Sequence, residues 1–510
     1  MIYDARILPA GAVLRAQVCV IGSGAGGSAA AMVMAEAGLD VLVLEAGDFY
    51  APDDMTQREQ QMLPRLYWDS AGRTTVDRQV RIHQGKGVGG STLHNLNLCK
   101  RIPTPLLQQW AREHSLSQLP LAAWMALYQE AEALLQVSSV PEDQWNRHNR
   151  LLQKGAEALG WRGAGLQHNR SGCVGSGFCE IGCAFDAKNN AAKVMLPRIV
   201  AAKGRVLTCA QAVRICHDGS AVSGVELRAV DPISGEPGAR LRVEAPCVVV
   251  AASATATPAL LLRSEVPDLS RKTGRTLRIH PAVVAAGEFA EPVQAWKGIP
   301  QTYECTEFLR FGDDRPRQGE PDRLWIVSAF GHPMGVATML PGSGATHRKG
   351  MTAYSHLAVL TAMLHDETEG RVEPAGDLGL RIDYQPNAAD QAQLRAGSRR
   401  IAQLLLAAGA KRVWIPQRDP VQVLGTADLD AAEQIDLGQA GLTAVHPMAS
   451  CPMSDDPLAG PCDSRGRHHG LAGLWISDGS LFPTSIGGPP QLSIYSLGLH
   501  VGRAVVRHRV

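Results

Sequence analysis

The sequence predicts an α/β fold, and three features near the N-terminus support this prediction. An apolar run, Val18–Ile21, fits a buried parallel strand. A G-x-G-x-x-G turn at residues 22–27 follows it and lets the backbone approach a pyrophosphate. After a small-residue segment, 28–37, that fits a closely packed helix, a second apolar run at 41–44 ends at Glu45, an acid placed to hydrogen-bond a ribose hydroxyl. This order indicates a dinucleotide-binding βαβ unit, and a tight strand–helix turn without a ligand is the alternative.

Length and charge limit the classes of protein to which the chain can belong. At 510 residues it is too long for one core, so we expect two interleaved domains. The formal net charge is +1 and no run of Lys or Arg could follow a phosphate backbone, so no nucleic-acid partner is expected. No apolar stretch is long enough to predict a membrane span. The N-terminus lacks the basic-then-apolar layout of an export signal, which favours a cytoplasmic location.

Hydrophobic periodicity and turn residues place the remaining elements. We expect helical structure at 105–165, 389–408 and Gln491–Arg509, strands at 205–216, 221–230 and 239–252, and many loops at 290–350. Eleven cysteines in a chain of this size are expected to be reduced thiols, several of them buried in strands, as at Cys19 and Cys247.

A second glycine-rich segment at residues 85–92 extends the predicted cofactor site. Its glycines, including Gly87, Gly89 and Gly90, would bring another set of backbone N–H groups onto the same pyrophosphate. A bound and retained cofactor needs such a second set of contacts. The two glycine segments together therefore indicate FAD rather than NAD.

Six motifs resemble those of the glucose–methanol–choline (GMC) oxidoreductase family, in the order and at the spacing of that family. They are residues 22–27, 41–47, 85–91, 256–264, 446–453 and 476–483. The resemblance runs from one end of the chain to the other. The form of the motif at 446–453, together with residues 274–281, is similar to a bacterial branch of the family that is related to long-chain alcohol oxidases.

The resemblance implies a two-part architecture. A Rossmann-type FAD-binding domain would be assembled from residues 1–105, 190–275 and 440–510. An interleaved α+β substrate domain, built on an antiparallel sheet with flanking helices, would comprise residues 106–189 and 276–439. This second domain would cover the isoalloxazine ring.

The resemblance also implies which residues contact FAD. Gly22, Gly24 and Gly27 would lie at the pyrophosphate, Glu45 at the adenosine ribose, Val213 near the adenine, Asp478 and Gly479 beside the ribityl chain, and Gly87, Gly89, Gly90, His94 and Asn95 in the second glycine segment. The implied chemistry is a two-electron oxidation of a CH–OH carbon, with hydride transfer to flavin N5.

His446 aligns with the catalytic histidine of the family and is the predicted general base. The unperturbed pKa of histidine lies near physiological pH, so the ring can accept the hydroxyl proton and return it. A buried histidine with a structural role is the alternative. The family places a second His or Asn where this chain has Pro489, which has no side-chain donor or acceptor. Either His446 acts alone, another pocket residue substitutes, or the enzyme has moved away from simple alcohol oxidation.

His94 falls where some members of the family carry a histidine bonded covalently to the flavin. The resemblance implies a bond from His94 to the flavin 8α carbon, which would raise the potential of the flavin. A histidine that hydrogen-bonds near the ring without bonding to it is the alternative.

Three cysteines, Cys173, Cys179 and Cys183, lie in a glycine-rich loop. Thiolates this close together would suit an iron–sulfur cluster or another metal. A similar loop in some bacterial members of the family holds a three-iron cluster. Four ligands are the commoner requirement, and His168 is a candidate for the fourth. A structural loop with buried thiols, or with one disulfide, is the alternative.

The sequence predicts the substrate less precisely than it predicts the type of reaction. The segments of the expected substrate domain carry no concentrated charge, and an aromatic content of 5% does not favour a cage for a quaternary ammonium group. We therefore expect a neutral, fairly apolar alcohol. Electrons would pass to oxygen in an oxidase, or to a cluster or a quinone-type acceptor in a dehydrogenase. A specialised biosynthetic redox enzyme and a flavin-binding protein without turnover are the remaining alternatives.

Overall fold

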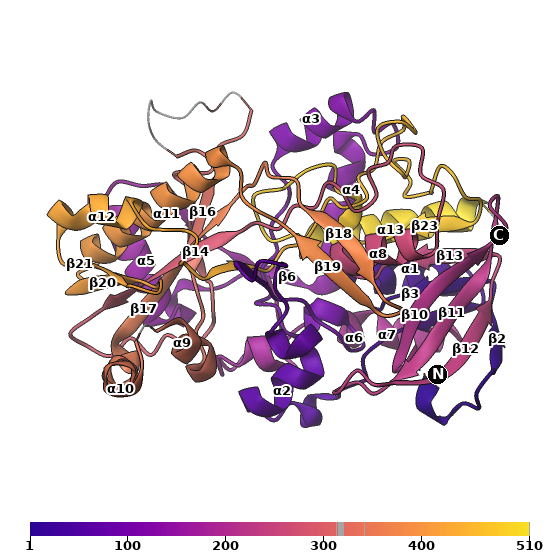
Figure 1. Ribbon diagram of the computed structural model, residues 1–510, viewed down its shortest axis with the longest axis horizontal. Helices are drawn as coiled ribbons and strands as arrows, with labels where there is room; N and C mark the ends of the chain where they lie inside the picture. Colours follow the sequence, from indigo (N-terminus) through magenta and orange to yellow (C-terminus); the bar gives the residue numbers. More distant parts are fainter. Residues whose placement is uncertain (313, 315–320, 341, 509–510) are drawn as a thin grey trace.

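The computed structural model describes residues 1–312, 314, 321–340 and 342–508 of the chain. Two bodies lie next to each other along its long axis (Figure 1). One contains both ends of the chain and a parallel sheet, and the other contains a large antiparallel sheet. No helix within these ranges is both long enough and apolar enough to cross a membrane.

The first body is built on a six-stranded sheet in which every neighbouring pair is parallel. In sheet order the strands are β1 (Ile2–Asp4), β9 (Arg205–Thr208), β4 (Val41–Leu44), β3 (Val18–Ile21), β13 (Cys247–Val250) and β23 (Leu474–Ile476). Strands β3, β4 and β13 are fully buried, as is typical of parallel strands covered on both faces. The predicted strands on either side of the first glycine turn are confirmed.

Helix α1 (Ala25–Glu36), which is rich in small residues, packs on β3 and β4 of this sheet, and α13 (Gln491–His508) packs on α1. The other helices of this body are α3 (Thr104–Glu113), α4 (Leu121–Leu135), α6 (Ala191–Val194), α7 (Leu196–Ala201) and α8 (Ser253–Arg263). A Cβ on Gly498 of α13 would lie 2.5 Å from the carbonyl oxygen of Gly26 in α1, so glycine allows these two helices to approach closely. The predicted last helix is confirmed as far as His508, and Arg509 lies outside the described residues.

A four-stranded sheet completes the first body. Its strands are β10 (Ala210–His217), β11 (Val222–Val230), β12 (Pro237–Glu244) and β2 (Val13–Arg15). The predicted strands at 205–216 and 239–252 are each divided between the two sheets. The first is interrupted at Cys209, which has a φ of +52°, and the second at Pro246, which has no N–H to continue a ladder.

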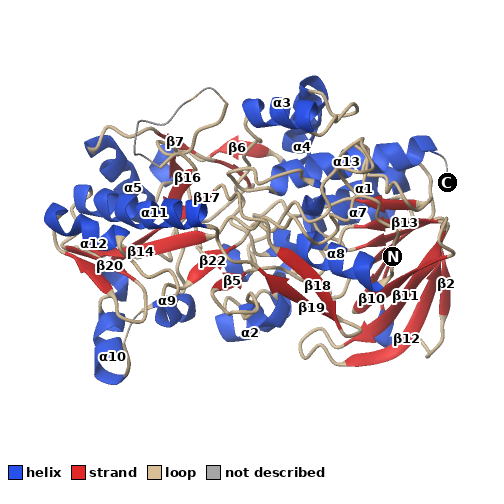
Figure 2. Cartoon of the chain, turned by 45° about the horizontal axis from the view of Figure 1, so that its top comes forward, coloured by secondary structure: helices blue, strands red, loops and turns tan. Residues whose placement is uncertain are grey.

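The second body is built on a nine-stranded sheet that is antiparallel except where β5 joins it. In sheet order the strands are β21 (Val421–Val423), β20 (Arg412–Ile415), β14 (Ala282–Glu288), β17 (Leu357–Leu364), β16 (Leu324–Ser328), β15 (Tyr303–Cys305) and β7 (Gly163–Gly165), with β22 (Leu442–Ala444) beside β14 and β5 (Val80–Ile82) beside β22. Helices α5 (Arg147–Ala158) and α11 (Ala388–Ala407) pack on this sheet (Figure 2). The predicted helix at 389–408 is confirmed.

Smaller elements connect these layers. They are α2 (Glu59–Leu66), β6 (Val137–Ser139), β8 (Gln167–Asn169), α9 (Pro333–Met339), α10 (Gly344–Thr352), β18 (Arg371–Ala375), β19 (Gly379–Asp383) and α12 (Leu429–Glu433). The prediction of a loop-rich segment at 290–350 is wrong for β15, β16, α9 and most of α10, and its residues 313, 315–320 and 341 lie outside the described part. All five residues of β16 are buried, so this strand has no alternating pattern that the sequence could reveal.

Each body has its own hydrophobic core. The first core includes Trp110, Trp124 and Tyr128 of α3 and α4. These two helices therefore pack with the parallel sheet, although the sequence assigned residues 106–189 to the substrate domain. The described cysteines are all free, and Cys19 and Cys247 are buried in β3 and β13 as predicted.

Candidate active site

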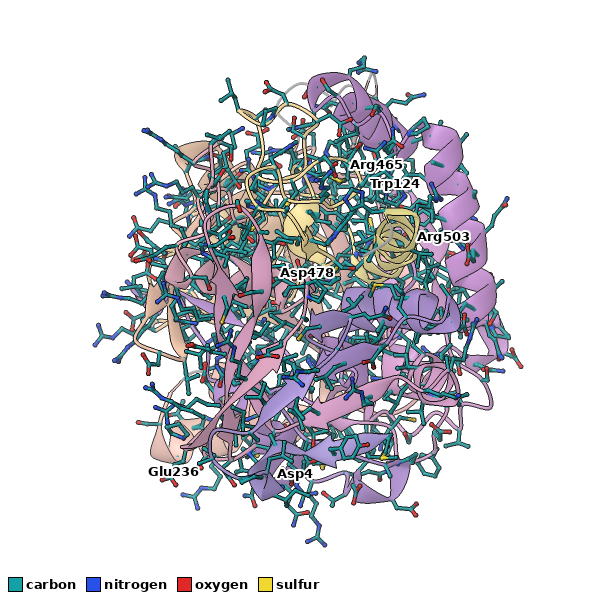
Figure 3. The ribbon with its side chains drawn as sticks, turned by 90° about the vertical axis from the view of Figure 1, so that its right-hand side faces the viewer. Asp4, Trp124, Glu236, Arg465, Asp478 and Arg503 are labelled. Atoms are coloured by element: carbon teal, nitrogen blue, oxygen red, sulfur yellow. The ribbon has the colours of Figure 1, made fainter. Side chains whose placement is uncertain are left out.

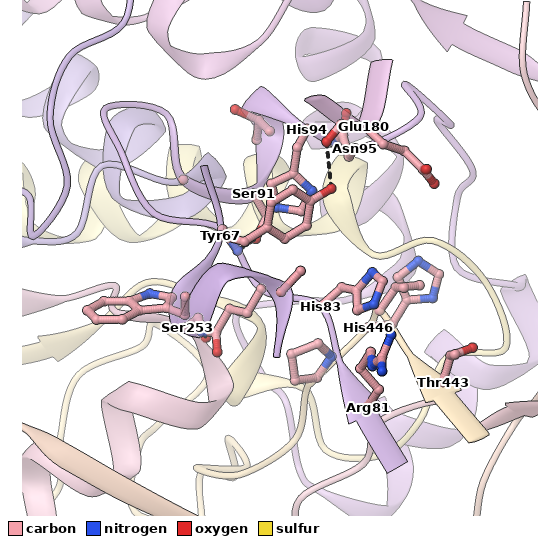
Figure 4. Close-up of a pocket in the computed structure, with 18 of the residues that line it drawn as sticks. Tyr67, Arg81, His83, Ser91, His94, Asn95, Glu180, Ser253, Thr443 and His446 are labelled. Carbon is pink, nitrogen blue, oxygen red and sulfur yellow. Dashed lines mark hydrogen bonds between the residues drawn. The ribbon is translucent and has the colours of Figure 1, made fainter. Parts of the chain in front are cut away.

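One large cavity, with a volume of about 710 Å³, is lined by residues of both bodies, and Figure 4 draws part of this lining. The predicted site residues that line it are Gly22, Gly24, Glu45, Gly90, His94, Asn95, His446, Asp478, Gly479 and Pro489. Gly27, Gly87, Gly89 and Val213 are not part of the lining, and Gln211 and Ala212 line the cavity next to Val213. The structure therefore brings most of the predicted residues to one site.

Close backbone contacts require glycine in the first turn. A Cβ on Gly26 would lie 1.9 Å from the carbonyl oxygen of Ser477, and one on Gly27 would lie 2.0 Å from that of Gly22. A Cβ on Gly24, by contrast, would meet no protein atom within 4 Å, because this residue faces the cavity. Helix α1 begins directly after it without a side-chain cap, so its first N–H groups can bind an anion in the cavity.

Glu45 joins the two glycine segments. Its Oε1 accepts hydrogen bonds from the N–H groups of Gly47 (2.9 Å) and Gly87 (3.1 Å). Its Oε2 accepts from Ser23, from the N–H at 3.1 Å and from Oγ at 2.6 Å. These bonds use the four acceptor positions of the carboxylate. Ser23 Oγ in turn accepts from the N–H of Gly89 at 3.0 Å, so Ser23, which the sequence reasoning missed, also holds the two segments together.

Asp478 holds the opposite side of the cradle. Its Oδ2 accepts hydrogen bonds from the N–H of Ser253 (2.9 Å) and from Thr257 Oγ1 (2.5 Å), and its Oδ1 accepts from the N–H of Ser480 (2.9 Å). Figure 3 shows this carboxylate in the interior of the molecule, and burial raises its pKa. The ordered turns, the free helix N-terminus and the two carboxylates form an elongated cradle that fits a dinucleotide cofactor.

His446 follows β22 and lines the cavity. Its Nδ1 lies 3.1 Å from Nδ1 of His280, and the two rings are nearly perpendicular, at 83°. The N–H of Gly487 donates to Nε2 of His280 at 3.0 Å. Burial, followed by the neighbouring His280, lowers the pKa of His446 well below its usual value. Burial and then His365 lower the pKa of His280 in the same way, so both rings are neutral.

The backbone of His280 is held in an uncommon conformation. Its φ is +52°, in the left-handed region that side-chain-bearing residues rarely adopt. The buried carboxylate of Asp366 accepts hydrogen bonds from the N–H groups of Ile279 (3.0 Å) and His280 (3.3 Å). It also accepts from the hydroxyl groups of Tyr384 and Ser485, both at 2.8 Å. This network keeps the His280 ring against His446.

Pro489 lines the cavity, but the ring that contacts His446 comes from His280. The sequence reasoning used residues 274–281 as a family motif without assigning His280 to the site. The two histidines are 166 residues apart, and no spacing rule connects them. The one signal in the sequence was a histidine inside the motif at residues 274–281.

Comparisons with known proteins show the family to which the chain belongs. Two family models, both described as GMC oxidoreductase, match residues 63–282 and 367–498. The chain belongs to the GMC oxidoreductase family. An uncharacterized GMC-type oxidoreductase of Mycobacterium tuberculosis is 34% identical over 97% of this chain and 76% of its own length. Long-chain-alcohol oxidase FAO3 of Arabidopsis thaliana is 26% identical over 97% of this chain and 68% of its own length.

Solved structures share the fold of this GMC oxidoreductase. Pyridoxine 4-oxidase from Mesorbium loti aligns with a TM-score of 0.72 at 18% identity, over 97% of this chain and all (100%) of its own. Formate oxidase of Aspergillus oryzae aligns with a TM-score of 0.71 at 15% identity, over 98% of this chain and 99% of its own. At these identities the likeness shows the fold alone. The predicted α/β fold with a second, antiparallel-sheet domain is confirmed.

In this GMC oxidoreductase, His94 lies beside Tyr67, with ring centroids 3.9 Å apart (Figure 4). Its Nε2 is buried and has no hydrogen-bond partner within the described residues. Burial, and then the charge of Lys188, lowers the pKa of His94 well below its usual value, so the ring is neutral. The Lys188 ammonium donates to the carbonyl groups of Leu93 (3.0 Å) and Asn95 (2.6 Å), which fixes the backbone on both sides of His94.

The cysteine loop is packed around its own thiols. In the described part of the chain, no three His, Cys, Asp or Glu side chains gather to hold a metal ion. Backbone N–H groups donate to Sγ of Cys173 at 3.4 Å and of Cys183 at 3.3 Å. The cavity that these residues share with Cys179 measures about 10 Å³, room for about one water molecule. His168 is turned to a backbone carbonyl at 2.9 Å. The predicted iron–sulfur site is thus not supported, and a structural loop of thiols fits this geometry.

The antiparallel sheet and α9 form an apolar wall on the far side of the cavity. Its residues include Trp325, Phe330, Val336, Met339, Leu340, Leu357, Val359, Met363 and Trp414. Polar groups gather near His446 instead, among them Arg81, His83 and Thr443 (Figure 4). Apolar walls with a few placed polar groups are typical of sites for small organic ligands.

Proposed function

We propose that this GMC oxidoreductase holds FAD in the cavity and oxidises the CH–OH group of a neutral, fairly apolar alcohol. The observation that supports this most strongly is that the glycine cradle, His446 and the apolar wall line one and the same cavity. The relatives named as long-chain-alcohol oxidases are consistent with a substrate of this class.

Different residues of the cradle would bind different parts of the cofactor. The first glycine turn and the N-terminus of α1 would hold the pyrophosphate. Glu45 would keep the two glycine segments around the ribose, and Asp478 and Gly479 would lie along the ribityl chain. Bound FAD would supply a two-electron acceptor for a hydride from the alcohol carbon.

His446 would meet the oxygen of the alcohol. It is neutral, it faces the cavity, and apolar residues form the wall beyond it. The charge on the substrate oxygen changes during the reaction. An imidazole held next to this oxygen, in a site that excludes water, interacts with that charge more strongly than it would in water. The apolar wall would hold the body of the alcohol and exclude water from the reacting carbon.

An anaerobic titration of the purified holoenzyme tests this proposal. Primary alcohols of increasing chain length are added while the visible band of the flavin is followed. We expect the band to bleach, with affinity rising by about fourfold for each methylene that covers the wall. His446→Ala should retain FAD and bleach about 100-fold or more slowly. An oxidised flavin across the whole panel, or tighter binding of sugars than of alkanols, would contradict the proposal.

Oxygen or another small acceptor would then take the electrons from the reduced enzyme. Readmitting air to the bleached sample separates the two cases. Rapid return of the yellow colour with stoichiometric hydrogen peroxide assigns an oxidase. Slow return with oxygen and fast return with a quinone assigns a dehydrogenase.

We also propose a covalent bond between His94 and the flavin. The free Nε2 and the neutral ring support it, because a bond-forming nitrogen needs an available lone pair. Acid precipitation of the holoenzyme should leave the yellow colour with the protein, and His94→Ala should release it. Complete release of FAD from the wild-type protein would contradict this bond and leave His94 as a neighbour of the ring.

A further inference from the structure

The hydrogen bonds around His446 determine which of its two ring nitrogens carries the proton. A backbone N–H can only donate, so the bond from Gly487 makes Nε2 of His280 an acceptor. A neutral His280 then carries its proton on Nδ1 and donates it across the 3.1 Å contact to Nδ1 of His446. The proton of a neutral His446 is therefore on Nε2.

The Nε2 edge of His446 faces the cavity. His280 covers the Nδ1 edge and is only 1% exposed, whereas His446 lines the cavity. Within the described residues, no side chain or backbone group makes a hydrogen bond to Nε2 of His446. This N–H is therefore available to a ligand.

His83 lies at the end of the neighbouring strand. Its N–H donates to the carbonyl of Ala444 at 2.9 Å, and β5 pairs with β22, the strand that leads to His446. Figure 4 shows the two rings at the same end of the cavity. Among the described residues none hydrogen-bonds the His83 ring. Burial, and then Arg81, lowers its pKa to about 4, so the ring is neutral and has a free lone pair.

We infer that His280 is a positioning residue that holds His446 as a hydrogen-bond donor to the substrate oxygen, and that His83 receives the hydroxyl proton. The inference rests on the proposed function. It departs from the general-base role predicted for His446, because Nε2 has no lone pair in this tautomer. His83 and His280 together supply the polar partner that Pro489 cannot.

In this reaction the alcohol loses one proton and one hydride. The O–H bond of the alcohol breaks and its proton forms an N–H bond on the His83 ring. The electron pair of the C–H bond would leave with the hydrogen as hydride, for which bound FAD would supply the two-electron acceptor, and the carbon–oxygen double bond would form. His446 keeps its proton throughout and stabilises negative charge on the oxygen.

Nitrogen NMR of the holoenzyme tests the tautomer without any turnover. The protein is labelled with ¹⁵N in histidine, and the His446 signals are assigned from their loss in His446→Gln. We expect a protonated Nε2 and an unprotonated Nδ1. A protonated Nδ1 with a bare Nε2 would overturn the inference and return the general-base role to His446, while leaving the proposed function intact.

Two isosteric variants test the direction of the hydrogen bond. His280→Asn keeps an N–H donor at the Nδ1 position and tolerates a positive φ, whereas His280→Asp places an acceptor there. We expect flavin reduction in His280→Asn within about threefold of wild type. Reduction in His280→Asp should be at least about 100-fold slower, since a wrong tautomer costs up to about 10⁴-fold. FAD content and thermal unfolding serve as the controls. Equal rates in the two variants would overturn the positioning role.

A third variant tests the proton acceptor. His83→Gln should bind FAD and alcohol normally and reduce the flavin about 100-fold or more slowly, as expected for the loss of a general base. His468→Asn, at a buried histidine outside the cavity whose pKa burial also lowers to about 4, is the matched control and should keep the wild-type rate. A rate for His83→Gln within threefold of its control excludes His83 as the acceptor.

Discussion

The two ends of the cavity are built in different ways. At the cofactor end, a single turn between β3 and α1 provides the glycines and the free helix N-terminus. At the catalytic end, His446, His280, Asp366 and Gly487 come from four separate parts of the chain, and the two histidines are 166 residues apart. Local backbone geometry therefore determines the first end, and tertiary packing determines the second.

The largest expected effect is a difference in stability between substitutions at two glycines of the same turn. Gly26→Ala should lower the free energy of unfolding by about 3 kcal/mol or more, because the new Cβ would meet the Ser477 carbonyl at 1.9 Å. Gly24→Ala has space within the protein and should fold normally but bind FAD weakly, since its Cβ would enter the cradle. Thermal unfolding and FAD content measure the two effects. Equal stability of the two variants would contradict the claim that local backbone geometry determines the cofactor end.

The next effect tests the packing of the catalytic end. Asp366→Asn should slow flavin reduction by about 100-fold, because an amide cannot accept all the hydrogen bonds that hold residues 279–280 and a small displacement of a catalytic group costs about that much. FAD content should stay near wild type, as Asp366 does not belong to the cradle. Stopped-flow reduction and flavin absorbance measure both quantities. A wild-type rate would show that the His280 backbone needs no support from this carboxylate.

The pH dependence of stability gives a smaller and more distributed effect. Burial lowers the pKa of His148, His332 and His468 to about 4 in the folded protein. The unfolded chain, with a histidine pKa near 6.5, therefore binds protons that the folded chain does not, and the free energy of unfolding falls as the pH falls from about 6.5 toward 4. Thermal scans between pH 7 and pH 5 should show this decline, and His332→Asn should make it shallower. A constant unfolding temperature over this range contradicts the neutral, buried rings.

The smallest effect distinguishes two neighbours on β10. Ala212 lines the cavity and Val213 does not. Ala212→Val should weaken FAD binding by about fivefold or more, as overfilling a packed site costs at least about 1 kcal/mol. Val213→Ala should leave the affinity unchanged. Titration of the apoprotein with FAD measures both, and the reverse order would return the adenine contact to Val213.

The same contrast between the two ends explains which parts of the fold and of the site could be predicted from the sequence. The βαβ unit was predictable because its strands, its glycine turn and Glu45 are adjacent, and each has a local physical requirement. The contact of His280 with His446 was not predictable, because it depends on β14, β22 and the Asp366 network meeting in space. β16 was missed because a strand buried on both faces has no period. For the three cysteines the sequence left a metal site and a structural loop open, because spacing alone does not show whether thiols converge on a metal or on backbone N–H groups.

Flavin reduction by a long-chain primary alcohol deuterated at C1, followed anaerobically, tests the central claim most directly. The account predicts that deuterium slows the bleaching of the flavin several-fold in the wild-type holoenzyme. It also predicts that His446→Ala, which removes the donor to the substrate oxygen, retains FAD and reduces it about 100-fold or more slowly. A flavin that stays oxidised with every alcohol, or that is reduced as fast in His446→Ala as in the wild type, would contradict the oxidation of a CH–OH carbon at this site.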